Sequence, residues 1–416
     1  MSIVCERQNS VVHFSSLVTR ISGEGSKAWE IHYLARTREA RGEDVILLSV
    51  GDPDFETPEP IVDRAIHSLR NGRTHYTAPA GIAALRDAIA KCHHATTGQS
   101  VTSDQVVVVP GAQCGLFSAL LCTLDAGDEV IAPQPMYVTY EATIGASGAR
   151  AVEVPLRSER RFHVDPQEIE DAVTPKTRAV LLNTPHNPTG AVLTREEVQA
   201  VAEICLRHGL WLICDEVYAS LTFDQLHISP AGLPGMATRS VTVSSLSKSH
   251  AMTGWRLGWV VAPRELAAHL TNLSLCMLYG TPPFIQDAAV LAVEEQAHAC
   301  EAMRSAYRRR RDLVVGRLSD IDGIECHRPE SGLYVMIDVR QTNQSAMDFG
   351  YGLLDEQGVA LLPADAFGPG LVGHLRLSLS CADELLAEAC ERIARYVAHS
   401  RADRGVKSMA PDPTAS

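Results

Sequence analysis

The sequence predicts an α/β protein with a mostly parallel sheet between helices and a second, smaller α+β domain. From residue 104 onward, short apolar runs alternate with helical patterns, which is typical of repeated strand–helix units. The run Val106-Val107-Val108-Val109 is apolar throughout, as expected for a strand buried on both faces of a parallel sheet. Beyond Arg264 the pattern becomes more helical and includes two later strands, which indicates the separate α+β domain.

The length, net charge and composition of the sequence argue against several classes of function. The 416 residues exceed one ordinary core, so a large and a smaller domain are expected. The 37 basic and 50 acidic residues leave a net charge of −13, which argues against nucleic-acid or anionic-membrane partners. No apolar run approaches the ~20 residues of a membrane span, and no signal peptide is expected. The 11 cysteines show no CxxC and no Cys/His metal spacing, which predicts reduced thiols, no metal site and a cytoplasmic protein.

Helices are expected where apolar residues recur at helical spacing, and strands where short apolar runs stand between turn residues. The expected helices are 29–41, 61–69, 83–92, 112–124, 165–173, 194–208, 284–318, 347–356 and 382–399. The expected strands are 45–50, 106–109, 130–132, 151–156, 179–182, 210–214, 240–243, 332–339 and 374–379.

Three local patterns bear on this assignment. Thr194 and Glu197 form a plausible capping box at the start of one helix. The four arginines at 308–311 are adjacent rather than on one helix face, so a solvated surface is predicted for them. Residues 23–28 match a loose GxGxxA pattern, but no strand precedes it, so a dinucleotide site is not expected there.

Polar side chains follow four of the predicted strands at the point where each strand ends. Tyr137 follows one strand, Asn187 lies in a proline-rich turn after the next, Asp215 ends a third, and Lys248 follows a fourth. Open α/β sheets bind ligands beyond the carboxyl ends of their strands, so these side chains are expected at one sheet edge. Taken singly, Tyr137 could instead be an aromatic residue of the core, and Asp215 could instead cap a helix.

The loop around Lys248 predicts covalent chemistry. A lysine among serines and glycines is usually a solvated charge, but here its neighbours suit a Schiff base with a phosphate-bearing cofactor. Ser245 and Ser247 supply hydroxyls for an anion, and Arg256 follows eight residues after the lysine. The stretch from Ser244 to Trp259 resembles the Schiff-base loop of class I/II aminotransferases, which use pyridoxal phosphate.

A second anion site is expected after the strand at 106–109. The segment Gly111-Ala112-Gln113 turns from this strand into a helix. Free N–H groups and the helix dipole favour a phosphate at such a position. The alternative is that the glycine serves only the turn.

The other candidates suit the remaining parts of pyridoxal phosphate. Asp215 would pair with the pyridine nitrogen and keep it protonated. Tyr218 and Asn187 would bond the oxygen of the ring hydroxyl, and Tyr137 would stack on the ring. Once the substrate amine has displaced Lys248, this lysine would act as the general base that moves the α-proton.

The resemblance to fold-type-I aminotransferases of class I/II covers residues 17–400. It rests on the motifs at 51–55, 76–81, 187–190, 215–218 and 245–256 and on Arg376. It implies a seven-stranded, mostly parallel sheet and a homodimer with shared active sites, in which Tyr76 and Thr281 would contact the neighbouring subunit's phosphate. The implied division is an N-terminal arm and part of the small domain at 1–50, a large cofactor domain at 51–290, a small domain at 291–400 and a disordered tail at 401–416.

Within that family the chain is similar to transaminases of guanidino amino acids, which act on arginine with pyruvate or make enduracididine-type amino acids. The similarity rests on the segments at 28–33, 111–114, 135–141, 246–250 and 275–280. Relatives that act on aspartate often carry a lysine where this chain has Gln113, which makes an acidic substrate doubtful. The expected function is ping-pong transfer of the α-amino group from a basic amino acid to a 2-oxo acid.

Four residues are candidates for binding the substrate besides Asn187. Arg376 would hold the α-carboxylate through two hydrogen bonds, and Gly51 would let the backbone approach the ligand. A guanidinium needs a carboxylate or an aromatic face. Trp29 and Glu30 match the family's substrate-proximal segment, although Glu30 has the alternative of lying on a helix surface.

Three other functions stay open at this point. A pyridoxal lyase or an arginine oxidase would use the same residues. A nicotinamide dehydrogenase is opposed by the lack of a glycine fingerprint after a strand. A non-catalytic binding protein is opposed by the presence of Lys248 and Asp215.

Overall fold

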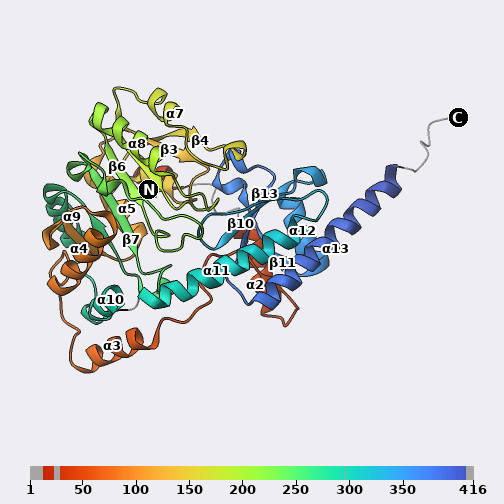
Figure 1. Ribbon diagram of the computed structural model, residues 1–416, viewed down its shortest axis with the longest axis horizontal. Helices are drawn as coiled ribbons and strands as arrows, with labels where there is room; N and C mark the ends of the chain where they lie inside the picture. The colour runs from red at the N-terminus through yellow and green to blue at the C-terminus, as the bar shows by residue number, and fades with distance from the viewer. Residues whose placement is uncertain (1–12, 23–28, 296, 409–416) are drawn as a thin grey trace, which may run out of the picture.

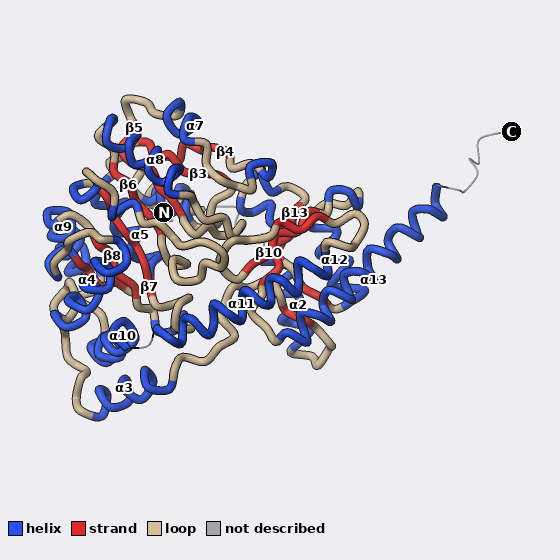
Figure 2. Tube along the Cα trace, in the orientation of Figure 1, coloured by secondary structure: helices blue, strands red, loops and turns tan. Residues whose placement is uncertain are grey.

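The computed structural model describes residues 13–22, 29–295 and 297–408, and it has two parts, each built around a sheet (Figure 1). The larger part contains a seven-stranded sheet with helices on both faces, and the smaller part contains a four-stranded sheet beside long helices (Figure 2). The predicted α/β class is therefore confirmed. The described residues include no helix long and apolar enough to cross a membrane.

The large sheet is parallel except at one strand. Its spatial order is β2 (Val106–Val109), β8 (Gly258–Val261), β7 (Ser240–Ser245), β6 (Trp211–Asp215), β5 (Thr177–Asn183), β3 (Glu129–Gln134) and β4 (Arg150–Pro155). Only β8 runs antiparallel to its neighbours, β2 and β7. The strands from β7 to β4 are all parallel, so their carboxyl ends lie at one edge of the sheet.

Helices cover both faces of this sheet because its strands are apolar on both faces. In β2, Val107 and Val109 pack in the core formed with α5 (Ala112–Thr123), whereas Val106 and Val108 pack with α4 (Ala83–Thr97). Burial of each such side chain contributes roughly 1.5–3 kcal/mol. The remaining helices of this part are α3 (Glu59–Arg70), α6 (Tyr140–Ala146), α7 (Pro166–Asp171), α8 (Arg195–His208), α9 (Arg264–Met277) and α10 (Pro283–Glu295). The predicted capping box of α8 is present, with Thr194 and Glu197 bonded to each other's backbone.

The smaller part contains an antiparallel sheet and a short parallel pair. The sheet order is β12 (Leu362–Pro363), β13 (His374–Ser378), β10 (Tyr334–Asp338) and β9 (Glu325–His327). The pair joins β1 (Ile46–Leu47) from early in the chain to β11 (Val359–Ala360). The helices of this part are α2 (Glu30–Glu39), α11 (Ala297–Leu318), α12 (Ala346–Gln357) and α13 (Asp383–Ser408), whereas α1 (Leu17–Arg20) contacts α6 of the larger part.

The helical prediction differs from the structure at the C-terminal end. The helix expected at 284–318 is helical at all of its described residues, as α10 and α11, and residue 296 between them is not described. The helix expected to end at 399 continues as α13 to Ser408 (Figure 1). Parts of the predicted arm, the GxGxxA segment and tail residues 409–416 lie outside the described residues.

The prediction of a solvated arginine run is wrong for two of its four members. Arg310 is 6% exposed and Arg311 is fully buried. Arg310 binds Asp54 through two nitrogens at 2.8 and 2.9 Å, and Arg311 binds Asp224 at 2.6 Å. Buried guanidinium groups need such carboxylate partners, and sequence adjacency does not reveal them.

Candidate active site

The carboxyl edge of the large sheet carries a cavity of about 320 Å³. Tyr137, Asn187, Asp215 and Lys248, each placed at or just beyond the end of a parallel strand, all line it. Arg376 of β13 reaches the same cavity from the small sheet. The other predicted residues in its wall are Trp29, Gly51, Ala112, Gln113, Tyr218, Ser245 and Arg256.

Lys248 lies three residues beyond the end of β7. Its Nζ donates a hydrogen bond of 2.6 Å to the carbonyl oxygen of Gly51. A Cβ on Gly51 would lie 1.5 Å from the hydroxyl of Tyr334, so only glycine allows the backbone to come this close. The amine is thereby held inside the cavity by a segment about two hundred residues earlier in the chain.

Asp215 is the last residue of β6 and is buried. One carboxylate oxygen accepts a hydrogen bond of 2.7 Å from the Tyr140 hydroxyl, and the other accepts from the Val217 backbone N–H at 3.2 Å. Burial raises the pKa of Asp215 to about 6, against the opposing effect of these two hydrogen bonds. Within the part of the chain that the structure describes, Asp215 forms no ion pair, and a cationic ring beside it would offset the cost of burying its charge.

The amino end of α5, where an anion site is predicted, lies in the wall of the cavity. No side chain caps this helix, and its first residues, Ala112 and Gln113, follow Gly111 at φ 83°. A Cβ on Gly111 would lie 2.4 Å from a guanidinium nitrogen of Arg256. Ser245, whose hydroxyl accepts from the Ser247 N–H at 3.3 Å, lines the same cavity. Uncapped N–H groups, hydroxyls and a guanidinium form the donor set that a phosphate requires.

The side chain of Gln113 forms hydrogen bonds to two threonines of the protein itself. Its Nε2 donates to the Thr143 hydroxyl at 2.8 Å, and its Oε1 accepts from the Thr139 hydroxyl at 2.8 Å. Gln113 therefore fixes α5 to the start of α6 through its side chain. Because this side chain is bonded to two threonines, we expect Gln113 to bind a phosphate through its backbone N–H only.

Arg376 is 3% exposed, and its guanidinium is only partly bonded. It donates to Asn187 Oδ1 at 3.0 Å and to the Ser49 carbonyl at 3.3 Å, and it lies 4.0 Å above the Tyr334 ring. Its Nε has no hydrogen-bond partner. An unpartnered, buried guanidinium nitrogen in the wall of a cavity is suited to a ligand carboxylate.

Four residues named from the sequence do not line this cavity: Gly111, which directly precedes Ala112, and Tyr76, Thr281 and Glu30. Tyr76 is 85% exposed and its ring contacts that of Tyr279 at 5.0 Å. Glu30 lies in the wall of a second, adjoining cavity of about 540 Å³ and accepts a hydrogen bond of 3.1 Å from the Tyr351 hydroxyl. Tyr218 does line the first cavity, and its hydroxyl lies 3.3 Å from that of Tyr334.

Three aromatic residues are among those of the site that the sequence did not predict. Tyr140 bonds Asp215, and Tyr334 and Phe367 both face the guanidinium of Arg376, at 4.0 and 5.0 Å. Tyr140 follows Tyr137 by three residues, which is a weak signal in the sequence. Tyr334 and Phe367 have no such signal, because only the packing of the two parts brings them to the cavity.

Comparisons with known proteins bear on what this cavity binds. The model of the family described as aminotransferase class I and II matches residues 43–393. The chain belongs to this aminotransferase family. Arginine–pyruvate transaminase AruH of Pseudomonas aeruginosa is 56% identical over 383 residues, covering 92% of this chain and 98% of that protein. An aspartate aminotransferase of Musicola paradisiaca is 37% identical, with 92% and 96% covered.

A solved structure agrees with this membership. A single mutant of Thermus thermophilus aspartate aminotransferase superposes with a TM-score of 0.88 at 34% identity and covers 93% of this chain and all of that one. This aminotransferase is therefore an enzyme that uses pyridoxal 5'-phosphate and exchanges an amino group between an amino acid and a 2-oxo acid. The uncapped end of α5, the buried Asp215 and the amine of Lys248 fit the phosphate, the ring nitrogen and the aldehyde of that cofactor.

Proposed function

We propose that this aminotransferase moves the α-amino group of arginine, or of a closely related guanidino amino acid, to pyruvate. Support comes from the 56% identity to a protein named arginine–pyruvate transaminase, over nearly the full length of both chains. The observation that carries the proposal is the acidic character of the second cavity, which adjoins the one containing Lys248 and Arg376.

The second cavity suits a guanidinium at the far end of the substrate. It shares Tyr137, Val138 and Phe367 with the first cavity. Its wall holds four carboxylates and, among the described residues, no lysine or arginine; the four are Glu30, Glu141, Glu153 and Asp365. Carboxylates pair with a guanidinium through charge-assisted hydrogen bonds, and an aromatic wall adds cation–π attraction. A substrate anchored by Arg376 at one end would present its cationic end to these acids.

The cavity residues have the following proposed roles toward the cofactor. When bound, the cofactor supplies an aldehyde and an electron-accepting ring. Lys248 would hold the aldehyde through Nζ, and its amine would later move the α-proton of the substrate. Asp215 would keep the ring nitrogen protonated, and Tyr140 would orient Asp215 through the hydrogen bond between them. Tyr218 and Asn187 would bond the ring oxygen, and Tyr137 would stack on the ring.

The phosphate and the substrate carboxylate have separate proposed sites. The backbone of Gly111, Ala112 and Gln113 would bind the phosphate with Ser245 and Arg256. Arg376 would bind the α-carboxylate, with Asn187 fixing the guanidinium. The cavity needs both sets because the substrate must be oriented while the cofactor stays in place.

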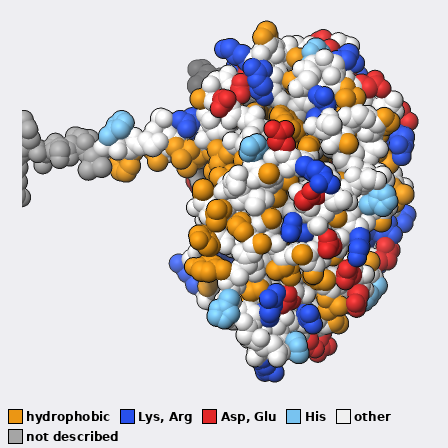
Figure 3. Space-filling model, turned by 90° about the vertical axis from the view of Figure 1, so that its left-hand side faces the viewer, with side chains coloured by type: hydrophobic (Ala, Val, Ile, Leu, Met, Phe, Trp, Pro, Cys, Tyr) orange, Lys and Arg blue, Asp and Glu red, His pale blue; other side chains and the backbone are white. Residues whose placement is uncertain are grey.

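We also propose that the enzyme is a homodimer whose subunits share their active sites. Figure 3 views the molecule from the side of α4 and α9, and hydrophobic side chains gather on part of that face. Exposed residues near these helices include Tyr76, Leu275, Met277 and Tyr279. Apolar area of this kind commonly marks a subunit interface. Thr281 is buried with no hydrogen-bond partner for its hydroxyl, and Tyr76 is free to reach a second subunit's phosphate.

Sedimentation of the holoenzyme tests this assembly. We expect a dimer of two 45.0 kDa chains, and we expect Tyr76→Ala to weaken cofactor retention without dissociating the dimer. A monomer with full activity would contradict the proposal. The domain boundaries at residues 50, 290 and 400 and a cytoplasmic location stay predictions.

A donor and acceptor screen tests the proposed reaction. We expect arginine to be the best amino donor with pyruvate, and we expect the 2-oxo acid product to form only when a keto acid is added. Product without an added keto acid, with ammonia release, would indicate an oxidase or a lyase instead. Lys248→Ala is the control, because it should lose both turnover and the absorbance band of the lysine-bound cofactor.

A further inference from the structure

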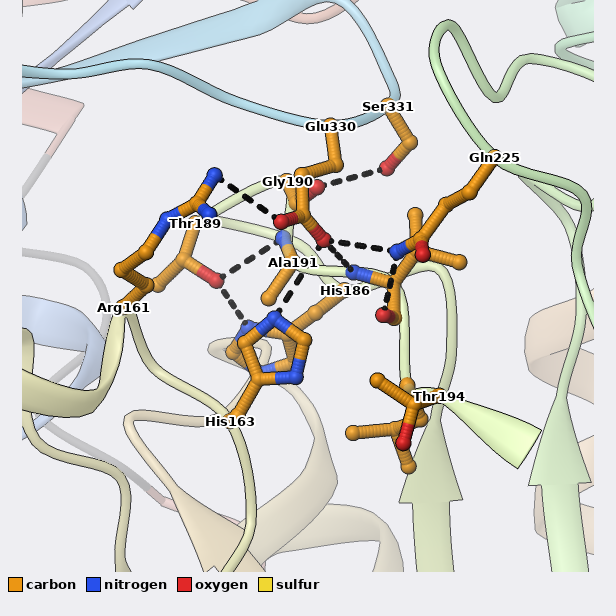
Figure 4. Close-up of polar contacts among 12 residues, drawn as sticks. Arg161, His163, His186, Thr189, Gly190, Ala191, Thr194, Gln225, Glu330 and Ser331 are labelled. Atoms are coloured by element: carbon orange, nitrogen blue, oxygen red, sulfur yellow. Dashed lines mark hydrogen bonds and ion pairs between the residues drawn. The ribbon is translucent and has the colours of Figure 1, made fainter. Parts of the chain in front are cut away.

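A cluster of polar side chains around Glu330 joins the two parts of the molecule outside the cavity (Figure 4). Glu330 lies in the connection between β9 and β10, and its side chain is 15% exposed. One carboxylate oxygen accepts from the Val192 backbone N–H at 3.0 Å and from Gln225 Nε2 at 2.9 Å. Both donors belong to the large part, so a residue of the small part is anchored there.

The backbone beside Glu330 contacts the same loop of the large part. The Glu330 N–H and the Ser331 hydroxyl both donate to the Gly190 carbonyl, each at 3.0 Å. A Cβ on Gly190 would lie 2.4 Å from Pro329, so the two segments are in close contact. Gly190 in turn donates its N–H to the His186 carbonyl at 2.7 Å, which closes the turn that contains Asn187.

Both segments that meet at Glu330 carry a residue that contacts Arg376 in the cavity. Asn187, within the turn, holds the guanidinium of Arg376 at 3.0 Å. Tyr334, four residues after Glu330 in the chain, lies under that guanidinium at 4.0 Å. Asn187 and Tyr334 are thus two of the four residues, with Ser49 and Phe367, that contact the guanidinium of Arg376, and each lies close in the chain to a contact of Glu330 or its neighbours.

Two cations face the Glu330 carboxylate. His163 lies 3.3 Å from one oxygen and 2.8 Å from Glu197 of α8, and Arg161 lies 3.0 Å from the other oxygen of Glu330. Hydrogen bonds to the two glutamates raise the pKa of His163 to about 9, so its ring is charged at neutral pH. Arg161 is 67% exposed, so water screens its interaction.

We propose that Glu330 and His163 are positioning residues that hold Asn187 and Tyr334 at the spacing with which Arg376 binds the α-carboxylate of the substrate. This inference rests on the proposed role of Arg376. Neither residue lines the cavity, and neither contacts the substrate; they act through the turn at 186–192.

Two inhibitors distinguish a positioning role of Glu330 from a general loss of structure in the variant. The probe 5-guanidinopentanoate has the carboxylate and guanidinium of arginine but no α-amine, and agmatine has the guanidinium but no carboxylate. In Glu330→Gln holoenzyme we expect binding of 5-guanidinopentanoate to weaken by roughly tenfold, because small displacements of an orienting group cost this much or more. We expect agmatine binding to change by less than about twofold, since it makes no use of Arg376.

Steady-state kinetics should show the same selective loss of carboxylate binding. The KM of Glu330→Gln for arginine and for pyruvate should rise by roughly tenfold, with kcat within about threefold, because both substrates present a carboxylate to Arg376. Arg161→Ala is the matched control, since it removes the exposed partner of the same carboxylate, and both constants should stay within about twofold. Equal weakening of both inhibitors, or an unchanged KM, would overturn the proposal.

His163→Gln supplies an independent arm should Glu330→Gln fail to fold. The charged groups in contact with the ring are Glu197 and Glu330, and Arg161, on the same segment as His163, pairs with Glu330. Between pH 7 and 10 the wild-type affinity for 5-guanidinopentanoate should fall as His163 loses its proton, whereas the variant should lack this change. A variant with the same pH profile as the wild type would exclude the role of His163. If Arg376→Lys itself leaves 5-guanidinopentanoate binding intact, the proposed role of Arg376 fails first, and this inference fails with it.

Discussion

Arg376 and Asn187 form a hydrogen bond of 3.0 Å between the small sheet and the large sheet, across the cavity that contains Lys248. Asn187 occupies one nitrogen of the guanidinium, the Ser49 carbonyl occupies another, and Nε has no partner. A planar guanidinium held in this way keeps a fixed orientation for a carboxylate. The distance between the two parts of the protein should therefore affect how Arg376 is oriented for the proposed substrate carboxylate.

Arg376→Lys should raise the KM for both arginine and pyruvate by roughly a hundredfold. A lysine cannot form two parallel hydrogen bonds with a carboxylate, and its ammonium would lose the ring contact with Tyr334. Steady-state kinetics with each substrate varied would measure this. The cofactor absorbance band should be unchanged, and a shifted band would indicate that the arginine instead contacts the cofactor.

Asp215→Asn should abolish turnover and stabilise the cofactor-free protein at pH 8. Because the pKa of about 6 in the folded protein lies above the ordinary aspartate pKa of 3.8, the penalty for burying the charge is absent below about pH 4 and complete above about pH 6. At pH 8 the substitution should therefore add about 2–3 kcal/mol to stability. Melting temperatures of the cofactor-free variants at pH 4 and pH 8 would test the sign, and a gain at pH 4 equal to that at pH 8 would refute this explanation.

Glu30→Ala should raise the KM for arginine by roughly fivefold to tenfold and leave that for alanine nearly unchanged. Glu30 is one of four acids in the second cavity, and alanine has no side chain that reaches them. Glu30→Ala with Glu153→Ala should lower the selectivity further. Glu196→Ala, an exposed acid on α8, is the matched control for net charge. An equal effect on arginine and alanine would count against the acidic cavity as the guanidinium site.

His163→Gln should destabilise the protein most at pH 6.5 and below. The pKa of His163 is raised from 6.5 to about 9 by its two glutamate partners. The stabilisation by these ion pairs is thus complete below pH 6.5 and is lost as the pH rises through about 9. The difference in melting temperature between wild type and variant, corresponding to about 1–3 kcal/mol at pH 6.5, should shrink toward pH 9.5. A difference independent of pH would indicate packing rather than charge.

Much of the cavity was predictable because parallel strands bring their carboxyl ends together. Tyr137, Asn187, Asp215 and Lys248 each follow an apolar strand, so their convergence follows from the strand pattern. Glu30 was placed near the substrate by resemblance, and the structure puts it in the adjoining cavity rather than beside Arg376. Arg310 and Arg311 were expected at the surface because their partners, Asp54 and Asp224, lie far away in the chain.

The α/β class, the glycine turn at Gly111 and the lysine loop after β7 follow from the residues alone, because they depend on local periodicity, turn chemistry and strand order. Long-range packing places Tyr334 and Phe367 beside Arg376, gathers the carboxylates of the second cavity beside the first, and joins Glu330 to the loop that contains Asn187. Such contacts join segments from different parts of the chain through side-chain packing, which has no period in the sequence.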